Sequence, residues 1–182
     1  MIFIEPTPTM RKQARREAKD MGSLRNSFTR GQGNETGMMG EIVIHDLFGG
    51  ERVGNRIYAY DLVLPNGVTV DVKTTRGSVE PLPHYVARVY GSEKDKEKLC
   101  AKCDVYYFVR CNSALSKVYV VGWLPARSFI EQALFLPKGH INPDDGKLSF
   151  ADEYTLPISE LNPPKRKITK RTIQKSSPLS MS

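Results

Sequence analysis

The feature that most constrains the fold of this chain is a predicted β-hairpin centred on "LPNGV", residues 64–68. The segments on either side, residues 58–64 and 68–75, are rich in β-branched and aromatic side chains, which is typical of strands. The Pro-Asn-Gly triplet between them suits a three-residue loop, because Pro presets the first φ angle and Gly accepts the left-handed conformation. We therefore expect two neighbouring antiparallel strands whose register is set by this turn.

A three-residue loop pairs Leu64 with Val68, and counting outward then places Asp61 opposite Asp71. Alternation along the second strand puts Lys73 on the same face as Asp71. Two carboxylates directly opposite each other on a sheet repel. A hard divalent cation with oxygen ligands would relieve that repulsion. In the purely structural interpretation, Lys73 simply neutralises Asp71 on a surface hairpin.

A two-residue Asn-Gly turn is the alternative for this loop. It would place Asp61 opposite Val72 and separate the two acids onto opposite faces of the sheet. The three-residue loop is favoured because Pro65 is a poor donor for the hydrogen-bond ladder and fits the loop better.

Glu41 is a third acid of interest, on a helix predicted to run from Asn34 or Thr36 to Phe48. It lies on the same stripe of that helix as Ile44 and Phe48, which are expected to face the core or the sheet. A carboxylate there is unfavourable unless it is paired or bound to a metal. An ion pair with His45, one turn further along, is the structural alternative.

The rest of the chain predicts further helices and strands around this hairpin. Helices are expected at residues 9–20, 92–102 and 125–135, and strands at residues 52–57, 85–89, 104–110 and 117–123. The order indicates an α/β sandwich in which helices flank a central mixed β-sheet. We expect three parts: a basic N-terminal helix and loop (1–33), a core domain (34–161), and a basic, disordered tail (162–182).

Composition limits the class of protein. The chain has 182 residues, of which 40% are hydrophobic and 26% charged, as in an ordinary globular protein. It has neither an apolar run of membrane-spanning length nor a signal-peptide pattern, so no membrane partner and a cytoplasmic location are expected. The net charge is +7, and the tail supplies most of it through six Lys and Arg residues. Such a tail either binds a polyanion or is a solvated segment that aids solubility.

Together, Gly40-Glu41, Asp61 and Asp71-Val72-Lys73 resemble the motif of the PD-(D/E)XK nuclease superfamily, which includes many restriction, recombination and phage nucleases. The segments "NSFTRGQGNETGMMGE", "VVGWLP" and "YTLPISEL" are also similar to small nucleases of this superfamily from phages and mobile elements. The chain departs from the motif by having Tyr60 rather than Pro before Asp61, and Asp rather than Glu at 71. It also lacks the Gln-x-x-x-Tyr element of one exonuclease branch, which argues against a processive exonuclease.

The resemblance implies a restriction-endonuclease-like fold and a DNA endonuclease, a phosphodiester hydrolase dependent on Mg²⁺ or Mn²⁺, either structure-directed or restriction-like. Asp61 and Asp71 would ligate the metal together with the Val72 carbonyl, and Glu41 would bind it directly or through water. Lys73 would orient the attacking water and stabilise charge in the transition state. A homodimer is compatible with this class, because many members dimerise to place two sites on two strands.

Basic residues around this motif are candidates for contact with the DNA backbone. Arg76 and Arg88 flank the predicted site, and the tail begins with three cations, Lys165, Arg166 and Lys167. The alternative is that all of these charges are solvated.

Two rival functions remain open at this point. One is a DNA-binding protein on a nuclease scaffold that no longer cuts. The other is a small zinc-dependent regulator built on Cys100 and Cys103, with His84 or His140 as a further ligand, although the second close pair of ligands usual in structural zinc sites is missing.

Overall fold

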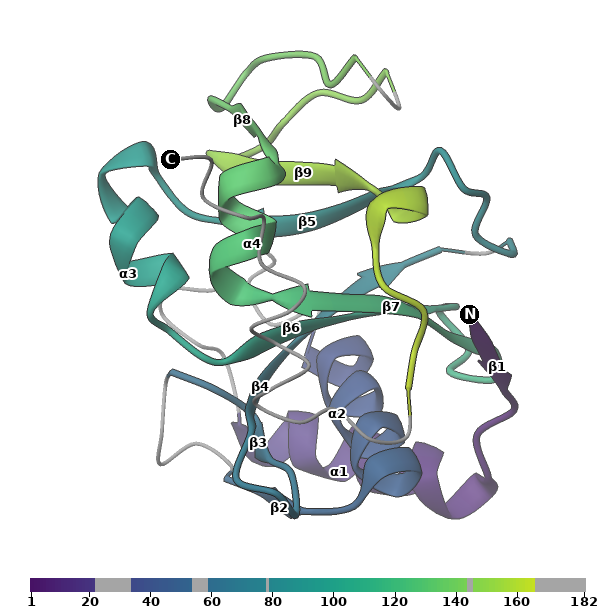
Figure 1. Ribbon diagram of the computed structural model, residues 1–182. Coiled ribbons are helices and arrows are strands. Elements are labelled where there is room, and N and C mark those ends of the chain that lie inside the picture. Colours follow the sequence, from purple (N-terminus) through teal and green to yellow (C-terminus); the bar gives the residue numbers. More distant parts are fainter. Residues whose placement is uncertain (22–33, 54–58, 78, 144–145, 166–182) are drawn as a thin grey trace.

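The computed structural model of the protein describes residues 1–21, 34–53, 59–77, 79–143 and 146–165. Over these residues the fold is α/β, with a six-stranded mixed sheet, a three-stranded sheet and flanking helices (Figure 1). The strands are β1 (Ile2–Ile4), β2 (Glu51–Arg52), β3 (Leu62–Val63), β4 (Thr69–Arg76), β5 (Val86–Tyr90), β6 (Val105–Cys111), β7 (Val118–Pro125), β8 (Leu134–Leu136) and β9 (Glu153–Pro157). The α-helices are α1 (Pro8–Met21), α2 (Asn34–Phe48), α3 (Lys96–Cys100) and α4 (Ala126–Gln132), and short 3₁₀ turns span Glu93–Asp95 and Ile158–Glu160.

The larger sheet has the strand order β1-β7-β6-β4-β3-β2. Its central pair, β4 and β6, runs parallel, and every other neighbouring pair in it is antiparallel. The mixed sheet flanked by helices is therefore confirmed. Besides this mixed sheet, β5, β9 and β8 form a second, smaller sheet. The sequence did not indicate β8 or β9, which are short and pair with each other across a long intervening loop.

The hairpin has the predicted register. Leu62 pairs with Val70, the Leu64 amide donates to the Val68 carbonyl at 2.9 Å, and Gly67 has the left-handed φ of +77° that the three-residue loop requires. The first strand is shorter than expected, because regular pairing with β4 ends at Leu62. Residues 54–58 of the predicted strand segments lie outside the described residues.

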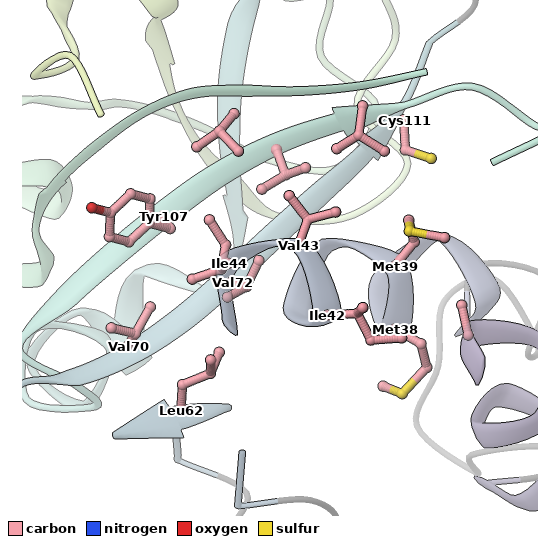
Figure 2. Close-up of a cluster of buried hydrophobic side chains, with 14 of the residues drawn as sticks. Met38, Met39, Ile42, Val43, Ile44, Leu62, Val70, Val72, Tyr107 and Cys111 are labelled. Atoms are coloured by element: carbon pink, nitrogen blue, oxygen red, sulfur yellow. The ribbon is translucent and has the colours of Figure 1, made fainter. Parts of the chain in front are cut away.

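Each face of the larger sheet is covered by a different hydrophobic cluster. On one face, α1 and α2 pack against side chains such as Val70, Val72 and Tyr107; Figure 2 shows Val43 and Ile44 of α2 directed toward the strands. On the other face, Tyr106 and Phe108 of β6 pack with α4 and the second sheet. Because side chains alternate along a strand, Asp71 and Lys73 of β4 project toward the second face.

Both described ends of the chain pack onto this body. β1 pairs with β7 at the sheet edge, and Ala14 and Ala18 of α1 are buried in the first cluster. At the other end, the Asn162 backbone bridges Trp123, and the Trp123 indole N–H donates to the Pro163 carbonyl at 3.1 Å. No helix in the described part of the chain is both long and apolar enough to cross a membrane.

Candidate active site

Asp71 is a buried carboxylate held by two lysines. Its side chain is only 3% exposed, and its two oxygens lie 2.8 Å from the Lys73 ammonium and 2.7 Å from the Lys102 ammonium. Burial alone would raise the pKa of Asp71, but Lys73 and Lys102 together outweigh burial and lower it. Asp71 is therefore ionised at neutral pH.

Lys73 remains a cation in this environment. Burial alone would lower the pKa of Lys73, but the neighbouring Asp71 outweighs burial and raises it. The ammonium also lies 5.9 Å from the centre of the Tyr106 ring. Because Lys73 stays protonated, it is suited to stabilising negative charge or donating a hydrogen bond, and not to abstracting a proton.

Asp61 comes directly before Leu62, at the N-terminal end of β3. This position lies beside the middle of β4 and is called the end of β3 below. Its Oδ2 accepts a hydrogen bond of 2.7 Å from the Val72 amide, and its own amide donates to the Val70 carbonyl at 2.8 Å. Burial, and after it the charges of Asp71 and Glu41, raise the pKa of Asp61 from 3.8 to about 7. The Val72 amide and Lys73 offset this only in part. In the described part of the chain, no cation lies within ion-pair distance of this carboxylate.

Glu41 does not point into solvent. Its side chain is 12% exposed, and its Oε2 lies 2.9 Å from the Arg52 guanidinium, which also holds Glu17 of α1 at 2.7 Å. Burial raises the pKa of Glu41, and Arg52 offsets this only in part because Glu17 and Asp71 add to it. The alternative partner, His45, instead contacts the Gly50 carbonyl at 3.2 Å.

The position of Glu41 depends on the glycine before it. A Cβ atom at Gly40 would clash with the Thr74 hydroxyl of β4. Only glycine therefore lets α2 approach the strand that carries Asp71 and Lys73 this closely. This steric requirement gives a physical reason for the Gly-Glu pair in the motif.

The three acids influence one another electrostatically: Asp71 lies on β4, Asp61 directly precedes β3, and Glu41 lies on α2. The charge of Asp71 raises the pKa of both Asp61 and Glu41, and the charge of Glu41 also raises the pKa of Asp61. Such mutual repulsion between buried carboxylates is the condition that a bound cation relieves.

The oxygen atoms around Asp61 are of the chemical type that a hard divalent cation prefers. Val70 and Val72 are two residues apart, so the Val72 carbonyl points to the same side of β4 as the Val70 carbonyl, toward Asp61 and beyond the end of the β3 ladder. Two carboxylates and one carbonyl, completed by water, form a donor set of the kind that Mg²⁺ accepts. No three His, Cys, Asp or Glu side chains in the described segments are arranged to hold a metal by themselves. Backbone oxygen and water would therefore have to supply part of the coordination.

The other predicted contact residues lie in different surroundings. Arg76 ends β4 and donates to the Thr36 hydroxyl of α2 at 3.4 Å. Arg88 lies on β5, where its side chain is 16% exposed and 3.9 Å from the buried Glu153. Lys165 is exposed, and its carbonyl accepts from the Tyr107 hydroxyl at 3.4 Å. Arg166 and Lys167 lie outside the described residues.

The cysteines give no support to a zinc site. Cys100, Cys103 and Cys111 are buried free thiols, and no metal-binding group in the described part of the chain includes them. Burial raises the pKa of Cys103 far above its ordinary value, so the thiol stays protonated and donates to the Val105 carbonyl at 3.2 Å.

Sequence reasoning missed Arg52 and Lys102. Lys102 lies three residues before β6, outside the parallel ladder in which Asp71 pairs with Tyr106, and its side chain reaches Asp71 from there. No local pattern in the sequence marks Lys102 as a partner of Asp71. Arg52 was visible only as part of a weakly predicted strand.

Neither family models nor curated proteins gave a match to this chain when its sequence was compared with them.

Proposed function

We propose that this protein is a Mg²⁺- or Mn²⁺-dependent DNA endonuclease with a restriction-endonuclease-like fold. What supports the proposal is the mutual electrostatic effect of Glu41, Asp61 and Asp71, together with the ion pair of 2.8 Å between Lys73 and Asp71. Three mutually repelling buried acids are unfavourable in a purely structural role, and the same arrangement suits binding of a cation.

In this proposal, Asp61, Asp71 and the Val72 carbonyl would hold the metal, and Glu41 would contribute directly or through water. A bound metal would supply a water of lowered pKa and positive charge to balance the scissile phosphate. Lys73 is charged and fixed by Asp71, so it orients the attacking water and stabilises the charge that develops on the phosphate. Attack in line with the leaving group breaks the P–O3′ bond and leaves a 5′-phosphate and a 3′-hydroxyl.

A catalytically inactive DNA-binding protein is the second candidate. The observation in its favour is that two of the three acids are already paired with cations: Asp71 with Lys73 and Lys102, and Glu41 with Arg52. A scaffold that no longer binds metal would have this internal compensation. The raised pKa of Asp61 favours the enzyme, because the Val72 amide and Lys73 compensate the charge of this carboxylate only in part.

The decisive experiment is a panel of linear, circular, branched and single-stranded DNA substrates with Mg²⁺, Mn²⁺ or EDTA. The enzyme predicts cleavage of at least one substrate that EDTA abolishes and that Lys73→Ala strongly reduces. Cleavage that survives both EDTA and Lys73→Ala would refute the mechanism. Specific DNA binding without any cleavage would establish the inactive scaffold.

The basic tail is proposed to bind DNA phosphates without sequence preference. Truncation after Lys165 keeps the Trp123 contacts and removes Arg166, Lys167 and the remaining tail cations. The salt dependence of DNA binding should then become shallower, while the cleavage rate at saturating DNA is unchanged. An unchanged salt slope would rule the tail out as a phosphate contact.

A further inference from the structure

Lys102 is a second cation at Asp71 and comes from a segment outside the motif. It lies between the end of α3 and the start of β6, and its ammonium is 2.7 Å from Asp71 Oδ2. Its side chain is 28% exposed, so one side of it faces solvent while its charged end reaches a carboxylate that is 3% exposed. Lys102 thus connects the buried acid to the surface.

The two lysines that contact Asp71 differ in what else holds each ammonium in place. Lys73 belongs to β4 itself, and its ammonium is also attracted by the Tyr106 ring and by Asp61. Within the described residues, Asp71 is the ion-pair partner of Lys102, which lies outside the regular helices and strands. Of the two, Lys102 therefore loses less on leaving Asp71.

A divalent cation at Asp71 needs a carboxylate oxygen that a lysine now holds. Two ammonium groups and a divalent cation around one carboxylate repel one another strongly. One lysine must move away as the cation binds, and the difference in their surroundings identifies Lys102. A long, flexible side chain released at the mouth of the site remains within reach of a phosphate bound there.

We propose that Lys102 is a substrate-positioning residue: it leaves Asp71 when the divalent cation binds, and its ammonium then contacts a phosphate of the nucleic-acid strand. This inference rests on the proposed nuclease function and assigns a residue to its substrate contacts. It predicts opposite effects of Lys102 on the two ligands, because the lysine competes with the metal and assists the phosphate.

The first test is titration of Mn²⁺ into the full chain without DNA, followed by isothermal calorimetry. Lys102→Met keeps the length of the apolar stem and leaves Lys73 to compensate Asp71. It should bind Mn²⁺ several-fold more tightly than wild type, on the order of an ion pair's contribution. Lys98→Ala removes an exposed lysine of the neighbouring α3 and is the matched control, with unchanged affinity. If Lys102→Met bound Mn²⁺ with equal or lower affinity than wild type, Lys102 would not compete with the cation for Asp71.

The second test is DNA affinity in Ca²⁺, a cation commonly used to allow binding without cleavage, together with KM and kcat in Mg²⁺. Lys102→Met should weaken DNA binding and raise KM by about three- to tenfold, the contribution of one phosphate contact, with a smaller change in kcat. Lys102→Arg should restore most of the DNA affinity, because a guanidinium also binds phosphate. Unchanged DNA affinity and KM in Lys102→Met would overturn the phosphate contact.

These outcomes separate the two proposals. Absence of Mn²⁺ binding and cleavage in the wild type would remove the proposed function, and with it the role of Lys102. Binding and cleavage by the wild type, with no effect of Lys102→Met on either ligand, would leave the nuclease intact and overturn only the inference about Lys102. Circular dichroism of each variant checks that the fold is retained.

Discussion

Two regions of this molecule bury acidic side chains, and they compensate the charge in different ways. In the second sheet, Glu153 is 1% exposed, accepts a hydrogen bond of 2.7 Å from the Ser149 hydroxyl, and has Arg88 of the adjacent strand 3.9 Å away. In the described residues, the Glu153 carboxylate is thus accompanied by the Arg88 guanidinium and the Ser149 hydroxyl. At the end of β3, by contrast, three acids repel one another, and Asp61 has a backbone amide but no cation in the described residues.

The comparison shows that burial of a carboxylate does not by itself indicate a functional site. Glu153 is as buried as Asp71, but its partners account for it as a structural group. What distinguishes the end of β3 is mutual repulsion that the surrounding residues leave partly unrelieved. The predictions below test whether this difference separates catalysis from stability.

The largest effect is expected for Lys73→Ala. Loss of its positive charge beside the scissile phosphate should reduce kcat by about 10²–10³-fold, as for removal of one preorganised donor to a transition state. The protein should still fold, because Lys102 remains on Asp71. Single-turnover cleavage in Mg²⁺ measures the effect. A rate within threefold of wild type would remove Lys73 from the mechanism.

The next effect concerns the pH dependence of stability, through Asp61→Asn. Because the folded-state pKa of Asp61 is about 7 and its ordinary value is 3.8, the folded protein binds more protons than the unfolded chain between these values. The free energy of unfolding of the wild type should therefore fall as the pH rises through this window. Each unit of difference between the folded and unfolded pKa of Asp61 corresponds to about 1.4 kcal/mol, so the total fall is a few kcal/mol at most.

Asp61→Asn retains an oxygen to accept from Val72 and should flatten this decline, as measured by urea unfolding at pH 5, 6, 7 and 8. Glu153→Gln is the matched substitution of a buried acid in the other region and is measured in parallel. An identical pH slope in wild type and Asp61→Asn would show that Asp61 is not destabilised by its neighbours.

A smaller effect is expected from Gly40→Ala, which tests how α2 brings Glu41 to the site. The added methyl group would meet the Thr74 hydroxyl and should destabilise the protein by about 1–3 kcal/mol, the usual range for overpacking. Gly37→Ala, on the same helix, meets nothing within 4 Å and should instead stabilise the protein by about 0.5–1 kcal/mol. Thermal or urea unfolding of the two variants distinguishes them, and equal effects would contradict the close approach of α2 and β4.

The smallest effect on cleavage is expected from Arg88→Ala. This variant leaves Glu153 buried without its cation and should lower the free energy of unfolding by about 1–3 kcal/mol. Cleavage at a temperature where the variant is folded should stay within about twofold of wild type. A large rise in KM would instead make Arg88 a DNA contact, as its position in the sequence first suggested.

Much of the site's framework could be predicted from the sequence, because local rules determine it. The turn chemistry of Pro65 to Gly67 set the register in which Leu62 pairs with Val70, and the apolar stripe through Ile44 placed α2 against the sheet. Period-two alternation placed Lys73 with Asp71. Each of these inferences spans only a few residues.

The remainder depends on contacts between distant segments. Arg52 reaches Glu17 across 35 positions of the chain, and Lys102 reaches Asp71 from the segment that precedes β6. β1 and the β8–β9 pair consist of short segments that become strands only through their partners in the sheets. Local propensity cannot identify such pairings, so the second sheet and the charge compensation at the site were not anticipated.

We propose that the carboxylate of Asp61, which has no ion-pair partner among the described residues, lies at the end of β3 because it holds a divalent cation together with Asp71. Calorimetric titration of Mn²⁺ into wild type, Asp61→Asn and Glu153→Gln at one pH tests it most directly. The account predicts Mn²⁺ binding by wild type, binding at least tenfold weaker in Asp61→Asn, and wild-type binding in Glu153→Gln. No binding by wild type, or the same affinity in all three proteins, would contradict it.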